Sequence, residues 1–179
     1  MAVTLKQDEA VPASYPATPA GLSAAAAALP APLIWQRIEA YISARWTARA
    51  VVWLAEGPGD WVPLLTPATI NLVEQWSGTA WATATPDPSP LGGFCLDDAT
   101  YRVTATVGSG TVPATVNAAF SRLAEYFGAN SDDLGPGVTK GSTDLAELHL
   151  ETERPATWLA RALINSGAAD LLRPYRRLS

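Results

Sequence analysis

Apolar side chains recur every three or four residues in three stretches of the chain, and this spacing predicts three helices. The predicted helices span residues 32–47, 113–128 and 155–166. The apolar face of the first consists of Trp35, Ile38, Ile42 and Trp46, and that of the second consists of Val116, Phe120, Leu123 and Phe127. Pro113 suits a first helical position, and Gly128 is a C-terminal stop signal. Stripes of this kind are typical of helices that pack on a core.

Residues 49–107 follow a different pattern, in which runs of β-branched and aromatic residues are separated by glycine and proline. The segment EQWSGTAW predicts a β-hairpin with a two-residue turn at Ser77-Gly78. Such a turn brings Trp76 and Trp81 close together. We therefore expect a small antiparallel sheet inserted between the first two helices.

Three segments are predicted to lie outside these elements. Residues 1–22 are rich in proline and alanine and predict an extended arm. Residues 129–153 predict an acidic loop, in which the run LAELHLE fits either a strand or one helical turn. Residues 168–179 predict a C-terminal tail. The expected fold class is α+β, with about three main helices and the inserted sheet forming one domain over residues 23–167.

Composition and charge favour a protein that contacts other proteins. Charged residues make up 16% of the chain, where about a quarter is usual for a soluble domain. The net charge is −5. Three arginines lie in the last seven residues, so the rest of the chain carries 9 basic and 17 acidic residues. A body this acidic is not typical of nucleic-acid binders, because phosphate recognition needs basic groups.

Targeting and redox signals are few. Cys95 is the one cysteine, so an intramolecular disulfide is excluded and a reducing compartment fits. No run reaches the roughly 18 apolar residues of a membrane span. The first ten residues lack the basic start and apolar run of a signal peptide.

Candidate chemistry is weak. Ser142, Asp144 and His149 could be drawn as a Ser-His-Asp set, but the nucleophile-elbow pattern is missing. One histidine and one cysteine do not supply the usual zinc ligands. The acidic pairs Asp97-Asp98 and Asp132-Asp133 could chelate a hard cation, although adjacent acids in loops are more often solvated turns. We therefore assign no catalytic, cofactor-binding or metal-binding residue and expect no enzyme.

Tryptophan suggests one alternative function. Six of the seven tryptophans fall within residues 35–81, which could form a carbohydrate- or peptide-binding platform in a monomeric module. Tryptophan in a small sheet more often serves packing, and we favour that interpretation.

Three segments in order resemble the head–tail connector, or head-completion adaptor, proteins of long-tailed bacteriophages and related gene transfer agents. The segment YRVTATVGSGTVPATVNAAFSRLAEYF (101–127) resembles that family's strand, glycine turn and amphipathic helix. WVPLLTPATINLVEQW (61–76) is similar to its strand, proline turn and next strand. ARALINSGAADLLRPYRR (160–177) resembles its final helix and ending. The proline- and alanine-rich arm and the insertion over residues 166–170 depart from the family pattern.

The resemblance implies structural work in the neck of a virion or gene transfer agent particle, by a protein made in the bacterial host cytoplasm. Such proteins form a ring, typically of twelve copies, beneath the portal protein. The ring extends the channel for double-stranded DNA, which passes without sequence-specific binding, and joins the head to a stopper or other neck or tail protein. No cofactor and no membrane are implied.

The tail supplies a docking hypothesis for the portal. Aromatic and arginine residues are the usual energetic anchors of interfaces, and proline lowers the ordering cost of a segment. The predicted docking residues are Leu171, Leu172, Arg173, Pro174, Tyr175, Arg176 and Arg177. A frayed basic end is the alternative interpretation.

Overall fold

The computed structural model describes residues 2–129, 140–145, 148–153 and 157–176. It is a mixed α+β structure with antiparallel sheets, as the sequence pattern predicts. The chain divides into two compact units instead of the single domain that we expected over residues 23–167. The β unit combines the N-terminal residues to Tyr15 with Ser43–Thr111, and the helical unit combines Pro16–Ile42 with the chain from Val112 onward.

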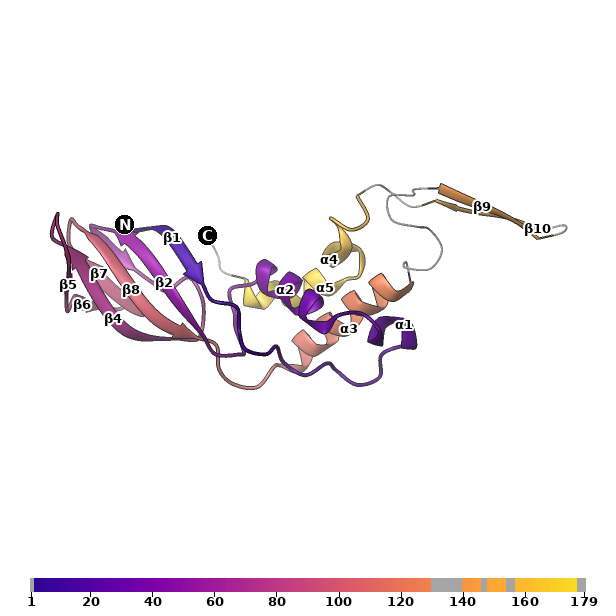
Figure 1. Ribbon diagram of the computed structural model, residues 1–179, viewed down its shortest axis with the longest axis horizontal. Helices are drawn as coiled ribbons and strands as arrows, with labels where there is room; N and C mark the ends of the chain where they lie inside the picture. Colours follow the sequence, from indigo (N-terminus) through magenta and orange to yellow (C-terminus); the bar gives the residue numbers. More distant parts are fainter. Residues whose placement is uncertain (1, 130–139, 146–147, 154–156, 177–179) are drawn as a thin grey trace. The chain divides into compact units, whose positions relative to one another are not determined.

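The β unit is built on a five-stranded antiparallel sheet with the strand order β1-β2-β8-β4-β5 (Figure 1). Its strands are β1 (Val3–Glu9), β2 (Arg49–Glu56), β8 (Thr100–Val107), β4 (Ala68–Trp76) and β5 (Trp81–Thr83). A second sheet of three strands has the order β3-β7-β6. Its strands are β3 (Gly59–Trp61), β7 (Gly93–Leu96) and β6 (Asp87–Ser89). The predicted sheet over residues 49–107 is therefore present, with β1 added at its edge.

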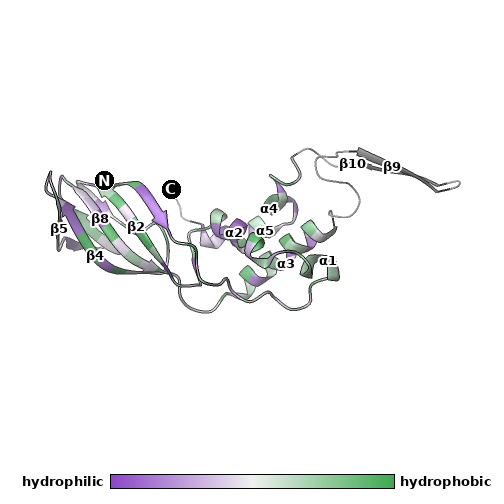
Figure 2. Ribbon diagram, viewed as in Figure 1, coloured by the Kyte–Doolittle hydropathy of each residue, from purple (hydrophilic) through white to green (hydrophobic). Residues whose placement is uncertain are grey.

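The core of the β unit follows the two-residue period of its strands. Along β8, every second side chain from Tyr101 to Val107 is buried. Polar and apolar positions interchange along the strands in Figure 2. Trp53 on β2 meets Trp61 on β3 with ring centroids 5.6 Å apart, and Trp61 stacks on Phe94 of β7. The tryptophans thus join the two sheets through their largest side chains.

Strand β1 replaces part of the arm that we predicted for residues 1–22. The indole N–H of Trp53 donates to Gln7 at 2.7 Å, and that of Trp61 donates to Thr4 at 2.9 Å. A buried indole N–H without an acceptor is costly. Strand β1 provides acceptors for both, which explains why a polar N-terminal segment belongs to the sheet.

A carboxylate at the end of β1 connects the strand to two buried arginines. Glu9 accepts two hydrogen bonds from Arg45, at 2.6 and 3.0 Å, and one from Arg49 at 3.2 Å. Arg49 also donates to the carbonyl and hydroxyl of Thr47, and its guanidinium lies 5.7 Å from the ring centroid of Tyr15. The cluster joins segments some forty residues apart in sequence.

The predicted tryptophan hairpin is present. Strands β4 and β5 pair in antiparallel register with Trp76 opposite Trp81. The connection spans residues 77–80, so it is longer than the two-residue turn that we predicted. The Ser77 backbone N–H donates to the carbonyl of Ala80, and the Ser77 hydroxyl donates to the same oxygen. These bonds close the four-residue turn.

The described residues of the helical unit form two longer helices and three short ones (Figure 1). They are α1 (Ala24–Ala27), α2 (Ala31–Tyr41), α3 (Ala114–Ala129), α4 (Ala162–Asn165) and α5 (Ala168–Leu172), followed by the 3-10 helix η1 (Arg173–Tyr175). Helix α3 confirms the predicted helix over residues 113–128.

The other two predicted helices are shorter than expected. Helix α2 ends at Tyr41 and not near residue 47. The Thr66 backbone N–H donates to Ser43, and the Arg45 N–H donates to Thr66, so the backbone after Ile42 is extended. The third helix was expected over residues 155–166, but of the described residues 157–166 only Ala162–Asn165 is α-helical, and Gly167 at φ 71° comes soon after it.

The core of the helical unit forms where α2 and α5 pack on α3. Trp35 and Phe120 lie with ring centroids 4.9 Å apart, and both are buried. Gly128, the predicted stop signal, is the last residue but one of α3 and is buried. A Cβ built at Gly128 would lie 2.8 Å from the backbone nitrogen of Ala26. Glycine is therefore required there for the close approach of α1 to α3.

Helix α1 is also tied to α3 by a carboxylate. The backbone N–H and the hydroxyl of Ser23 both donate to Glu125 at 2.7 Å, while the Ser23 hydroxyl oxygen accepts from the Ala26 N–H. The bonds from the Ser23 backbone and then from its hydroxyl lower the pKa of Glu125. A carboxylate with a lowered pKa adds stability above its unfolded pKa, and this stability is lost as the pH falls through the folded pKa.

We expect Glu125 to titrate below the ordinary range of a glutamate when followed by carboxyl NMR. In Ser23→Ala, its pKa should rise but stay below the ordinary value, because the backbone N–H remains. A Ser77→Ala variant, altered in the hairpin turn of the β unit, should leave the Glu125 titration unchanged. An ordinary pKa for Glu125 in the unaltered protein would contradict this contact.

The predicted acidic loop over residues 129–153 contains a hairpin. Strands β9 (Lys140–Leu145) and β10 (Leu148–Glu153) pair in antiparallel register. The run LAELHLE was expected to form either a strand or one helical turn. Its described residues are strand, with β9 ending before residues 146–147 and β10 beginning after them.

Candidate interaction surfaces

The residues considered for a Ser-His-Asp set lie on the β9–β10 hairpin. Backbone pairing places His149 opposite Asp144 and Ser142 opposite Glu151. The side chains of these residues lie outside the described part of the chain. So does Asp132-Asp133, whereas Asp97 and Asp98 are exposed at the end of β7. Within the described residues, no group of three or more His, Cys, Asp or Glu side chains is placed to hold a metal ion.

The tryptophans serve mainly as packing residues. Trp35, Trp53 and Trp61 are almost completely buried. Trp76 is 40% exposed, and its ring centroid lies 5.2 Å from that of half-buried Trp81. The guanidinium of Arg102 lies 4.6 Å from the Trp81 ring centroid. Trp81 therefore packs between Trp76 and Arg102 within the hairpin region.

The five-stranded sheet carries a shallow concavity on the side opposite its buried core. We call this the outer sheet face and define it by residues from four strands. They are Val52 and Leu54 of β2, Leu72 of β4, Trp81 of β5, and Arg102 and Thr104 of β8. Their registers agree, since Val52 and Leu72 both pair with Thr104, and Leu54 pairs with Arg102. Directly paired residues share one side of a sheet, so this is one continuous surface.

An ion pair stands at the rim of the outer sheet face. Arg102 donates to both oxygens of Glu74, at 2.7 and 2.9 Å. These bonds lower the pKa of the Glu74 carboxyl. The forked geometry orients the Arg102 guanidinium between Glu74 and the Trp81 ring. The apolar centre of the surface is therefore bounded by a fixed polar edge.

Our sequence interpretation missed this surface, although a signal for it exists. In RAVVWLAE, Val51, Trp53 and Ala55 point to the core, yet Val52 and Leu54 between them are also apolar. A strand with one solvated face usually alternates apolar and polar residues, and one covered on both faces does not. The composition of β2 is thus typical of a strand that is apolar on both faces.

The single cysteine belongs to a small polar cluster in the three-stranded sheet. The Ser89 hydroxyl donates to Asp60 Oδ1 at 2.6 Å, and the Cys95 thiol lies 3.4 Å from the same oxygen. The Ser89 bond and then the Cys95 bond lower the pKa of Asp60. The hydrogen bond to Asp60 is in turn the main cause that raises the pKa of the exposed Cys95 thiol.

We expect Cys95 to react slowly with iodoacetamide near neutral pH, because the thiolate is the reactive form and Asp60 disfavours it. Asp60→Asn should accelerate the reaction at constant pH, whereas Asp98→Asn, an exposed acid of the same unit, should change it little. Mass spectrometry of the alkylated protein measures both rates. Equal rates in the unaltered protein and Asp60→Asn would contradict the assignment.

The structure changes the picture of the predicted docking tail. Leu172 is fully buried in the helical unit, and Leu171 is half-buried. Pro174 lies within the 3-10 helix η1, so it does not hold the segment out of helical structure as we expected. Tyr175 forms a hydroxyl hydrogen bond with Thr115 at 3.0 Å. Residues 168–175 are therefore part of the helical unit, and not a separate tail.

Of the other predicted docking residues, three are exposed and one lies outside the described residues. Arg173, Pro174 and Arg176 are exposed, and the guanidinium of Arg176 lies 4.8 Å from the Tyr41 ring centroid. Arg177 lies outside the described residues. Arg173 and Arg176 thus lie at the surface of the helical unit, whereas Leu172 and Tyr175 are packed or hydrogen-bonded within it.

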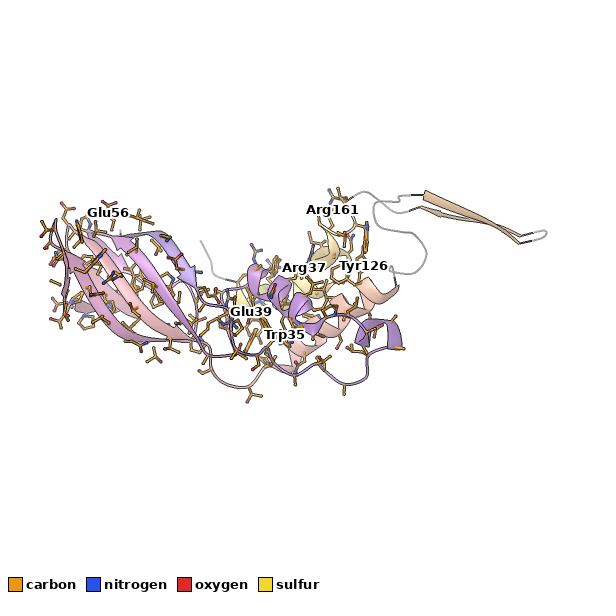
Figure 3. The ribbon with its side chains drawn as sticks, in the orientation of Figure 1. Trp35, Arg37, Glu39, Glu56, Tyr126 and Arg161 are labelled. Carbon is orange, nitrogen blue, oxygen red and sulfur yellow. The ribbon has the colours of Figure 1, made fainter. Side chains whose placement is uncertain are left out.

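A second exposed apolar surface lies at α4. We call it the α4 surface and define it by Arg161 and Ile164. Leu159 is 49% exposed and Ile164 is 70% exposed. The Ile164 N–H donates to the Arg161 carbonyl, so Arg161 and Ile164 are one helical turn apart. Figure 3 shows Arg161 beside α4, with Arg37 and Tyr126 also labelled in the helical unit. The guanidinium of Arg37 donates to the Leu159 carbonyl and so holds this segment against α2.

Charge is unequal between the two units. The described residues of the β unit include four basic and eight acidic side chains. Those of the helical unit, leaving out the β9–β10 hairpin, include five basic and three acidic side chains. The β unit is thus acidic, whereas the helical unit is basic without the hairpin and balanced with it, because the hairpin adds Lys140 and three acidic residues.

Among the described residues, no helix is both long and apolar enough to cross a membrane. Comparisons of the chain with protein-family models, with curated proteins and with solved structures each gave no match.

Proposed function

We propose that this protein is a structural head–tail adaptor that forms a ring, of about twelve copies by the resemblance of its sequence, beneath a portal protein. The observation that carries the proposal is the exposure of large apolar side chains in both units of a weakly charged chain. Leu72 and Trp76 are exposed on the β unit, and Leu159 and Ile164 on the helical unit. Surfaces of this kind are typical of protein–protein contacts.

The order of the elements supports the same proposal. The resemblance of residues 101–127 rests on a strand, a glycine turn and an amphipathic helix. Strand β8 and helix α3 are the strand and the helix of this segment. Gly108 and Gly110 between them have φ values of 91° and 87°, which glycine adopts without strain. The resemblance of residues 160–177 rests on a final helix and an arginine-rich ending, where α4, α5 and η1 lie.

In this role, the exposed arginines near the C-terminus would bind the portal. Arg173 and Arg176 project from a segment that α5 fixes on the helical unit, so little conformational entropy is lost on docking. The acidic β unit suits a wall past which DNA slides, because carboxylates repel phosphate. The outer sheet face and the α4 surface would contact neighbouring copies and the stopper. The particle neck is the proposed location, and no catalytic step is proposed.

Light scattering of the purified chain, alone and with portal rings from the same source, tests the function. We expect a large complex with the portal that Arg173→Glu/Arg176→Glu weakens at least tenfold, as loss of interface anchors does. Truncation before α5 is unsuitable, because it would remove buried Leu172. Arg122→Glu, another exposed arginine of the helical unit, serves as the matched control.

A chain that stays near monomer mass and does not bind the portal would refute the adaptor function. The exposed Trp76 next to the outer sheet face would then favour a monomeric ligand-binding module. That function predicts a change in tryptophan fluorescence when a sugar or peptide ligand is added.

A further inference from the structure

We propose that copies of this chain associate head to tail, with the outer sheet face of one copy receiving the α4 surface of the next. The inference rests on the proposed function in expecting copies of the chain side by side, and it names the two surfaces that meet. The two contacting surfaces differ. Each copy would bind one neighbour through its outer sheet face and the other neighbour through its α4 surface.

The outer sheet face has the properties of a receiving surface. Val52 and Leu54 form its half-buried floor, and Leu72 is 39% exposed beside them. The floor is a rigid sheet whose other side is core, so binding would cost little conformational entropy. Glu74, Arg102 and Trp81 are already fixed to one another at one rim. A partner therefore gains apolar contact without first ordering the surface.

The α4 surface has the properties of an inserting element. Ile164 is among the most exposed large apolar side chains of the described residues. Arg161 lies one helical turn from Ile164. An isoleucine and an arginine on a short, convex helical turn would place an apolar anchor in the concavity and a charge at its rim.

Charge complementarity selects a second copy as the occupant. Asp8 of β1 lies at the edge of the outer sheet face and is exposed, with Lys6 as an exposed ion-pair partner at 2.7 Å. Exposed pairs of this kind contribute little, so Asp8 can exchange Lys6 for an arginine. Arg161 of a neighbouring copy supplies that arginine. The excess of acid on the β unit favours contact with an arginine over contact with a second β unit.

The two surfaces differ, so the contact is heterologous and can extend from copy to copy. An isologous pairing of two outer sheet faces would bring the acidic β units together, and one of two α4 surfaces would bring Arg161 against Arg161. Head-to-tail association avoids both repulsions. This is the geometry that a ring requires, although the same contact could also extend as an open chain.

Disulfide trapping tests the contact directly. The double variant Leu72→Cys/Ile164→Cys is made in a Cys95→Ser background, which leaves one cysteine on each surface. Mild oxidation should produce a ladder of dimers, trimers and larger species on a non-reducing gel. The matched control is Leu91→Cys/Ile164→Cys in the same background. Leu91 is 66% exposed on the β unit but lies off the outer sheet face, so it reports random collision.

A ladder from the Leu72 pair that exceeds the Leu91 pair at least tenfold would support the inference. Adding Asp8→Arg should suppress the ladder, and adding Arg161→Asp to that variant should restore it. Equal ladders from the two pairs, dimers alone, a cross-link within one chain, or no cross-link would each overturn it. Portal binding without a ladder would refute this contact while leaving the adaptor function intact. A ladder without portal binding would support this contact and refute the adaptor function.

Discussion

Replacing Glu9 by glutamine should destabilise the β unit by about 3 kcal/mol, the order expected when a buried ion pair loses one partner. Arg45 and Arg49 keep 8% and 3% of their side-chain surface exposed, and Glu9 keeps 19%. Glutamine retains the size of the side chain but not its charge, so it leaves two desolvated guanidinium groups facing a neutral amide. The loss should appear as a lower urea midpoint, with faster hydrogen exchange in β2 and β8.

Asp8→Asn is the matched control for this prediction. Asp8 lies on the same strand and is also ion-paired, but the side chains of Lys6 and Asp8 are 60% and 62% exposed. Surface pairs contribute between about 0 and 1 kcal/mol, so the urea midpoint should hardly move. Similar effects from Glu9→Gln and Asp8→Asn would show that the arginine cluster does not hold β1 in place.

Leu172→Ala should destabilise the helical unit by about 3 kcal/mol, within the range for deletion of a buried leucine side chain. Leu172 is fully buried, and α5 packs on α3. The lost transfer free energy and the remaining cavity both contribute. Thermal unfolding followed by circular dichroism measures the loss, and hydrogen exchange in α3 should assign it to the helical unit.

Leu171→Ala is the control, because Leu171 is half-buried at the neighbouring position and should cost clearly less. The pair also separates two roles for the segment. If residues 168–176 were a free docking tail, Leu172→Ala would weaken portal binding and leave stability unchanged. Lost stability with intact Arg173 and Arg176 contacts would instead place the leucine in the core and docking on the arginines.

The sequence alone was sufficient where burial repeats within a single element. The alternation along TYRVTATV predicts β8, and the stripe from Val116 to Phe127 predicts α3, because each pattern reports one buried face. The hairpin that pairs Trp76 with Trp81 was also predictable, since a glycine-containing turn and its flanking strands are adjacent in the chain. The mixed α+β class follows from these local signals.

Tertiary contacts decided the features whose partners lie far away in sequence. The segment around Thr4 and Gln7 pairs with β2 and supplies acceptors for two buried tryptophan N–H groups. Gly128 was predicted only as a helix stop signal, but the close approach of the Ala26 backbone shows that this position also needs glycine for packing. Leu172 looked like an anchor for a partner and is part of the core. Local periodicity shows which side chains an element buries, but only the folded chain shows which distant group covers them.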